Sequence, residues 1–176
     1  MTEDLRYPIG KFTPQEDYSA QEIASFIQRI EQAPAAFETA VSTLSDSQLD
    51  TPYRDGGWTI RQVIHHVTDS HMNAYIRIKW TITEETPTIK AYDEKAWAQT
   101  PETTGAPALS LAILKPLHVK WVTLLKQLTP TDLKKQFFHP ESKKHIRLET
   151  ILGNYAWHGE HHLAHITSLK ARMNWK

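Results

Sequence analysis

Histidines gather near the end of the sequence. The stretch YAWHGEHHLAHI, residues 155–166, contains four of the ten histidines of the chain: His158, His161, His162 and His165. At about 100° per residue in a helix, these four side chains fall within an arc of roughly 100°. Four apolar residues lie on or beside the same arc: Ile151, Tyr155, Ile166 and Leu169. The histidines therefore point to the buried face of the helix, and because each buried imidazole needs polar partners, the pattern favours a metal site over hydrogen-bonded core histidines.

Two pairs in this stretch have the i, i+4 spacing that lets two imidazoles reach one ion. They are His158 with His162 and His161 with His165, and periodicity does not choose between them. Glu160 follows His158 by two residues, not one, so HGEHH is not the HExxH motif of metalloproteases. Glu160 lies roughly 200° around the helix from His158, so we expect it to point away from the site.

A third ligand is available in GGWTIRQVIHHVTDSHMNAYIR, where His66 is the candidate. Five polar residues lie within about 60° of His66 on the predicted helix and could line a pocket, although an ordinary solvated edge is the alternative. They are Gln62, Asp69, Ser70, Asn73 and Arg77. His65 lies about 100° from His66, away from the apolar arc, and is the poorer candidate.

The other histidines have no partner at ligand spacing. His71 falls near the apolar arc and could be a packed core histidine. We expect His118, His139 and His145 to be structural or solvated.

These candidates depend on four helical segments that the apolar periodicity predicts. The segments cover about residues 19–43, 58–83, 108–128 and 148–173. Pro34 predicts a kink or a break in the first, and Pro116 lies inside the third. Residues 83–107 form a long connection, a lid or a surface wrap, in which DEKAWAQ could be a short helix; residues 136–148 suggest a small hairpin. Four such helices with little strand indicate an all-α four-helix bundle.

Composition limits the function classes. The 176 residues suit one domain, and 20 Lys plus Arg balance 20 Asp plus Glu, so neither nucleic acid nor a membrane is an expected partner. We see no apolar run near the length of a membrane span and no signal pattern, and we expect a cytoplasmic location. There is no cysteine, so metal ligands must be histidine or carboxylate and any thiol must come from outside.

Three segments together resemble a known family. GW-x7-H, with Trp58 and His66, followed about 90 residues later by H-x3-H, with His158 and His162, resembles the DinB-like superfamily of metal-binding four-helix bundles. RYPIGKF, DTPYRDGGWTIRQVIHHVTDSHMNAYIR and YAWHGEHHLAHI look like its YfiT branch, whose members are described as metal-dependent hydrolases and linked to bacillithiol S-transferases. The resemblance covers nearly the whole chain.

The resemblance implies a single DinB-like domain over residues 1–176, with up-down-down-up helices and long crossing connections. It also implies that His66, His158 and His162 are the metal ligands, which settles the choice between the two histidine pairs. It fixes no general base.

Three neutral imidazoles leave a coordination position open, as in a catalytic zinc site, and such an ion activates a bound water or a bound thiol. We favour a bacillithiol-type S-transferase that conjugates a low-molecular-weight thiol to electrophiles. A metal-dependent hydrolase is the alternative, and a non-catalytic metal-binding or dimerising bundle is the third interpretation. Zinc is the first choice of metal and nickel the second.

Secondary roles are also predicted. Asp69 and Asn73 could orient a ligand or a substrate, and Arg77 could hold an acidic group of the thiol. A homodimer could form through the connection around Trp97 or through exposed parts of the first and third helices.

Overall fold

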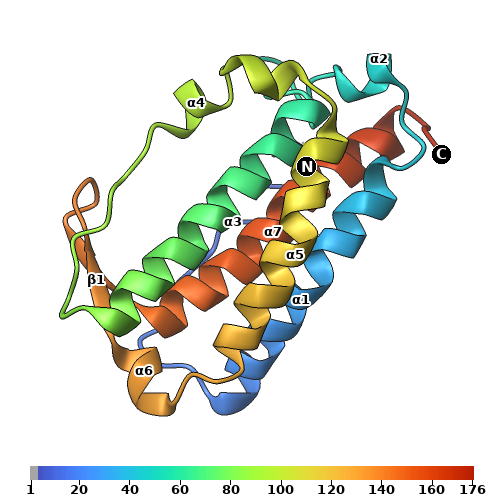
Figure 1. Ribbon diagram of the computed structural model, residues 1–176. Coiled ribbons are helices and arrows are strands. Elements are labelled where there is room, and N and C mark those ends of the chain that lie inside the picture. The colour runs from blue at the N-terminus through green and yellow to red at the C-terminus, as the bar shows by residue number, and fades with distance from the viewer. Residues whose placement is uncertain (1–3) are drawn as a thin grey trace.

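Four long helices form the bundle. The computed structural model describes residues 4–176, and its long helices are α1 (Ala20–Val41), α3 (Ile60–Thr83), α5 (Pro107–Leu125) and α7 (Leu148–Arg172). Figure 1 shows α1 and α7 running in one direction and α3 and α5 in the other. The all-α class and the up-down-down-up order are therefore confirmed.

Short elements join the long helices. They are α2 (Asp46–Leu49), α4 (Glu94–Trp97), the 3-10 helix η1 (Pro101–Thr104), α6 (Pro130–Lys134), and the antiparallel strands β1 (Gln136–His139) and β2 (Lys144–Arg147). The hairpin and the helix in DEKAWAQ are confirmed. The sequence analysis did not predict α2, η1 or α6, because helices of a single turn carry almost no periodic signal.

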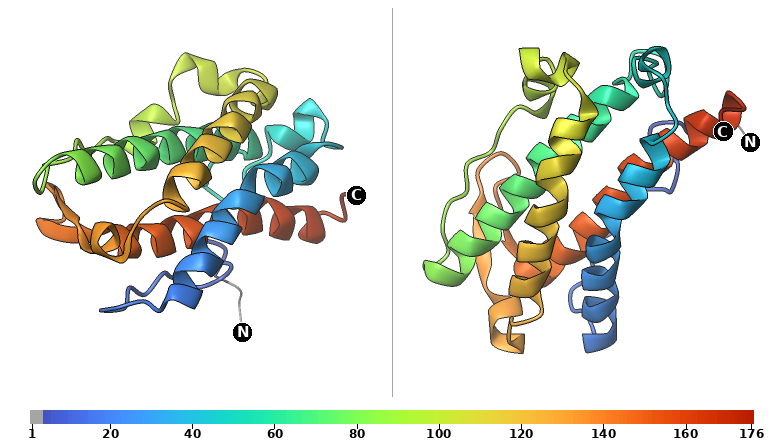
Figure 2. Two further views of the ribbon diagram at one scale, coloured as in Figure 1. Left: turned by 60° about the horizontal axis from the view of Figure 1, so that its bottom comes forward. Right: turned by 45° about the vertical axis from the view of Figure 1, so that its right-hand side comes forward.

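The connection between α3 and α5 runs the length of the bundle. Since α3 and α5 point the same way, the chain must return to the starting end, and it does so along the outside of α3 (Figures 1 and 2). The Phe138 N–H donates to the Pro87 carbonyl at 2.9 Å, and the Ile89 N–H donates to the Phe138 carbonyl at 3.1 Å. These bonds fasten the connection to β1.

The prolines do not break the helices. Pro34 lies inside α1 and Pro116 inside α5, and both helices continue past them, so a break at Pro34 is excluded. A proline still lacks an N–H, so the carbonyl four residues earlier loses its usual helical donor.

Two apolar clusters fill the interior, one toward each end of the bundle. The first includes Ile30, Ile78, Trp121 and Leu152, and the second includes Phe37, Ile64, Leu114 and Ile166. On every long helix the interval between the two clusters holds polar groups or a proline. These are Pro34 on α1, His71 on α3, His118 on α5, and His158, His161, His162 and His165 on α7. The core is thus divided by a belt of histidines at mid-height.

Helix α5 is more apolar than the sequence analysis expected. By length and composition it is long enough and apolar enough to cross a membrane, which corrects the expectation that no such stretch exists. A core helix of a bundle meets the same two criteria. Here Leu114 and Trp121 are buried in the bundle, whereas Leu109 and Val119 are exposed.

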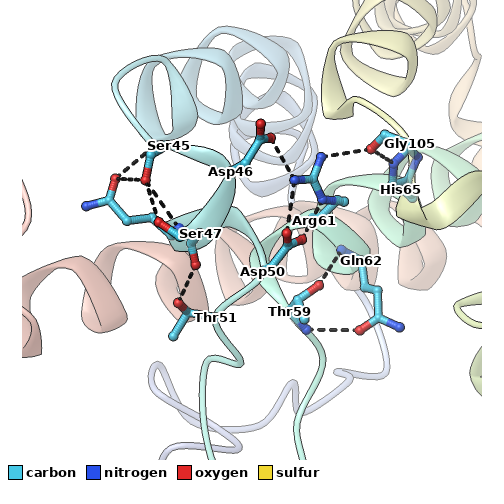
Figure 3. Close-up of polar contacts among 11 residues, drawn as sticks. Ser45, Asp46, Ser47, Asp50, Thr51, Thr59, Arg61, Gln62, His65 and Gly105 are labelled. Atoms are coloured by element: carbon cyan, nitrogen blue, oxygen red, sulfur yellow. Dashed lines mark hydrogen bonds and ion pairs between the residues drawn. The ribbon is translucent and has the colours of Figure 1, made fainter.

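A buried arginine ties together the end of the bundle at which α3 begins (Figure 3). Arg61 donates from Nε to Asp50 at 2.6 Å, from Nη2 to Asp46 at 2.9 Å, and from Nη1 to the Gly105 carbonyl at 3.0 Å. Hydrogen bonds to Asp50 and then to Asp46 raise the pKa of Arg61 above its usual value. One side chain thereby connects α2, α3 and the residues just before α5.

Replacing this arginine should loosen that end. We expect Arg61→Met to lower the free energy of unfolding by about 2 kcal/mol, because its charged hydrogen bonds are lost. The loss should not be larger, since Asp46 and Asp50 are exposed and can bind water instead. Arg29→Met removes a more exposed pair with Glu160 and should cost less than about 1 kcal/mol. Urea unfolding measures both, and equal losses would contradict the proposed role of Arg61.

Candidate metal centre

The predicted ligands come together from two helices. His66 on α3 and His158 and His162 on α7 each offer a ring nitrogen, and these three atoms lie within 4.8 Å of one another. The ring centroids are 5.4 Å apart for His66 and His158, 4.8 Å for His66 and His162, and 4.5 Å for His158 and His162. A modest movement would bring all three nitrogens to one ion.

A second group shares one member with the first. His161, His162 and His165 also place one ring nitrogen each within 4.8 Å, but all three come from α7. The His161 ring stacks on Trp157 at 4.5 Å, and the His165 ring stacks on Tyr53 at 3.9 Å. Geometry therefore brings together both pairs that periodicity left open, and the choice of His66, His158 and His162 stays a prediction.

Burial keeps these imidazoles neutral. Desolvation, followed by the charge of His161, lowers the pKa of His66 to about 4. Burial, together with the neighbouring histidines, lowers the pKa of His158 and of His162 well below the usual value. Neutral imidazole is the form that binds a metal, because its second nitrogen keeps a lone pair.

The donor set fits a divalent ion. Within residues 4–176, the Nδ1 atoms of His161, His162 and His165 are buried without a hydrogen-bond partner. An unpartnered buried nitrogen costs free energy, and a bound ion would remove that cost for His162, the one of these three residues that belongs to the proposed ligand set. Nitrogen donors without thiolate suit zinc and nickel alike.

A cavity of about 760 Å³ opens beside the histidines. It is lined by both candidate groups, by the aromatic residues Tyr7, Tyr53, Trp58 and Trp157, and by the charged residues Arg6, Arg54, Glu94 and Lys95. The Trp58 ring lies 4.5 Å from the His66 ring. Among the described residues, three cations and one carboxylate give the lining a net positive charge that favours an anionic ligand.

Apart from Gln62 on α3 and Trp157 on α7, three separate segments supply the non-histidine rim. They are the N-terminal segment with Arg6 and Tyr7, the loop of residues 53–58 before α3, and residues 94–99 of the connection. Gln62 joins two parts of this structure, because its Nε2 donates to the Ala98 carbonyl at 2.7 Å. Helices therefore hold the candidate ligands, and mostly loops form the rim.

The structure separates the other predicted site residues from this cavity. Asp69 and Asn73 do not line it; the Asn73 Nδ2 donates to the Asp69 backbone carbonyl at 2.9 Å. Burial, with a smaller contribution from Glu102, raises the pKa of the Asp69 carboxyl to about 6. Arg77 instead lines a second cavity of about 550 Å³, with Arg147 and Tyr155.

Several expectations about neighbouring residues are confirmed. Glu160 is bonded by Arg29, at 2.6 Å from the arginine Nε, away from the histidines. His65 has structural partners: its Nδ1 lies 2.8 Å from the Ser110 hydroxyl and its Nε2 lies 3.3 Å from the Gly105 carbonyl. His71 is fully buried, as a core histidine should be.

The sequence analysis assigned no role to the rim residues Arg6, Tyr53, Arg54 and Lys95. A signal was present in DTPYRDGGW, where an aromatic and a basic residue stand in a turn-rich stretch directly before the helix that carries His66. Such a turn is a common place for binding residues.

Comparison with known proteins agrees with this fold. Residues 29–166 match the model of the DinB superfamily, and the chain therefore belongs to that superfamily of helical bundles. Within it, the chain is similar to a Bacillus subtilis (strain 168) protein named "Putative metal-dependent hydrolase YfiT", with 53% identity over 173 residues, 98% of this chain and 97% of that protein. A Bacillus mycoides (strain KBAB4) protein with the same description is 53% identical over 172 residues, 98% of this chain and 99% of that protein.

A solved structure shows the same architecture. YfiT from Bacillus subtilis, described as a probable metal-dependent hydrolase with an unusual four-helix bundle topology, superposes with a TM-score of 0.97 at 52% identity. The match covers 98% of this chain and 99% of that one.

Proposed function

We propose that this protein is a metal-dependent enzyme that holds one divalent ion with His66, His158 and His162 and activates a low-molecular-weight thiol for transfer to an electrophile. Zinc is the proposed metal, with nickel as the second choice. The observation that carries the proposal is the composition of the cavity: among residues 4–176, the histidines share it with three cations and one carboxylate, Glu94.

The charged rim suits an acidic thiol such as bacillithiol. Arg6, Arg54 and Lys95 take the role that the sequence analysis gave to Arg77, since they line the histidine cavity. Arg54 lines the cavity, and its Nη1 donates to the Asp55 carbonyl at 2.8 Å, which helps to hold this cation at the rim. A divalent ion in this site supplies Lewis acidity, which lowers the pKa of a coordinated thiol or water.

The cations of the rim are the feature that favours an acidic thiol over water. Hydrolysis of an ester or amide usually needs a group that gives a proton to the leaving atom, and a carboxylate or histidine does this best. Glu160 faces Arg29, and Asp69 does not line the cavity, so Glu94, His161 and His165 are the lining groups that could give this proton. An activated thiol needs no further base, and the absence of cysteine means that the thiol must be a substrate. The names of the relatives support the alternative, a metal-dependent hydrolase.

A conjugation assay tests the proposal. Metal-loaded protein should accelerate the reaction of bacillithiol with an aryl chloride, in which a carbon–sulfur bond forms, chloride leaves and the thiol proton passes to buffer. The His66→Ala variant should lose the acceleration. Arg54→Met should raise KM for bacillithiol by about tenfold with little change in kcat, because a contact made equally in ground and transition states affects binding alone.

The alternatives predict different results in the same assay. Ester or amide turnover without thiol that needs the same three histidines would establish the hydrolase. If neither reaction is accelerated by the metal-loaded protein, the non-catalytic bundle is correct.

A further inference from the structure

Three histidines from three helices form a buried hydrogen-bonded row. His158 Nδ1 lies 3.3 Å from His71 Nε2, and His71 Nδ1 lies 2.8 Å from His118 Nε2. His118 Nδ1 lies 2.7 Å from the carbonyl oxygen of Ile30 on α1. The row thus leads from the candidate metal ligand His158 on α7 through His71 on α3 and His118 on α5 to α1.

Pro34 explains why the row ends at the backbone carbonyl of Ile30 on α1. In an α-helix the carbonyl of residue 30 accepts from the N–H of residue 34, but Pro34 has no N–H. The Ile30 carbonyl therefore needs another donor in a buried setting, and His118 provides it. A carbonyl oxygen can only accept, so the proton of His118 must be on Nδ1.

The position of this proton determines the others. His118 and His71 are almost completely buried, and a charge without a carboxylate partner would be costly there, so both are neutral. A neutral imidazole has one donor and one acceptor. With its proton on Nδ1, His118 accepts at Nε2 from the Nδ1–H of His71. His71 then accepts at Nε2 from the Nδ1–H of His158, whose Nε2 keeps its lone pair.

We propose that His71 and His118 are positioning residues that hold His158 in the tautomer with the proton on Nδ1 and thereby present its Nε2 as a metal ligand. The proposal rests on the proposed function for one point, the assignment of His158 as a ligand. Metal-binding histidines commonly donate their second ring N–H to a fixed acceptor, which sets both tautomer and ring orientation. Here that acceptor is another histidine, itself oriented by a third.

The first test needs no metal. Long-range proton–nitrogen correlation spectra of the metal-free full chain, with labelled histidine, distinguish the two tautomers of each ring. We expect His158, His71 and His118 all to carry the proton on Nδ1. A proton on Nε2 of His158 or His71 would overturn the proposal, whatever the activity of the protein.

The second test measures metal affinity. His118→Leu removes the acceptor for His71 and should weaken Zn²⁺ binding by about 10- to 100-fold, the usual effect of losing an outer partner of a ligand. His118→Gln should stay within about threefold of wild type, because one amide can donate to the Ile30 carbonyl and accept from His71. His145→Gln, exposed on β2, is the control and should leave affinity unchanged.

The outcomes separate this proposal from the proposed function. Equal weakening in His118→Leu and His118→Gln would show that His118 only fills space, and unchanged affinity in both would show that the row does not act on the metal. If His66→Ala also binds Zn²⁺ normally, the metal site itself is wrong. The supporting result is a proton on Nδ1 of all three histidines, together with weaker Zn²⁺ binding in His118→Leu but not in His118→Gln.

Discussion

Alanine at His66, His158 or His162 should lower the affinity for Zn²⁺ by more than about 100-fold, beyond the loss expected for an outer partner. Each of these residues contributes one of three ring nitrogens within 4.8 Å, so one substitution leaves at most two protein ligands. His161→Ala and His165→Ala should retain most of the affinity, since their rings already stack on Trp157 and Tyr53. Titration against a chelator of known affinity, with each variant checked by circular dichroism, measures the effect.

The two histidine groups make this comparison decisive. Only His162 belongs to both, so His162→Ala weakens binding under either assignment. If His161→Ala and His165→Ala lose most of their Zn²⁺ affinity and His66→Ala binds normally, the metal lies in the second group. That result would contradict the assignment of His66, His158 and His162.

Removing the metal should cost much of the stability. A ligand that binds only the folded state, present at about 1,000 times its dissociation constant, adds about 4 kcal/mol to the free energy of unfolding. For a chain of this size each kcal/mol shifts Tm by about 2–4 °C, so chelation should lower Tm by roughly 8–16 °C. The physical reason is that the ion would connect α3 to α7 through His66, His158 and His162, whereas in the unfolded chain His66 is far from the other two.

A matched pair of variants controls this experiment. His66→Ala should unfold at the same Tm with or without a chelator, and His161→Ala should keep most of the wild-type shift. A chelator-dependent shift of wild-type size in His66→Ala would mean that the stabilising ion binds elsewhere.

The helices and the buried histidine face could be predicted from the sequence because both follow the helical repeat. The apolar spacing predicted the four long helices to within a few residues, and the i, i+4 histidines faced the interior as expected. Neighbours on one helix are fixed by local geometry, so no knowledge of the rest of the fold is needed.

The polar stripe on α3 shows where such reasoning fails. Arg77 lies at nearly the angle of His66 around the helix, but it is eleven residues away, or about 16 Å along the axis. That rise carries it out of the histidine cavity and into the second one. The angle of a residue around a helix indicates the face on which it lies but not its position along the helix axis.

Contacts between segments far apart in the chain could not be predicted from the sequence either. His118 has no histidine near it in the chain, and its partners are Ile30 and His71, 88 and 47 residues away. The rim residues Arg6, Arg54 and Lys95 line one cavity only because the N-terminal segment, the loop before α3 and α4 converge there. Periodicity carries no information on such convergence.

The loop-built rim has an evolutionary consequence. The candidate ligands stand on α3 and α7, while Arg6, Arg54 and Lys95 stand on three segments that can each change in length or charge without shifting a helix. Insertions there are tolerated far better than changes inside packed helices. Selection can therefore alter substrate preference and metal retention independently. Exchanging these segments between related chains is accordingly a practical route to new specificities on an unchanged metal-binding frame.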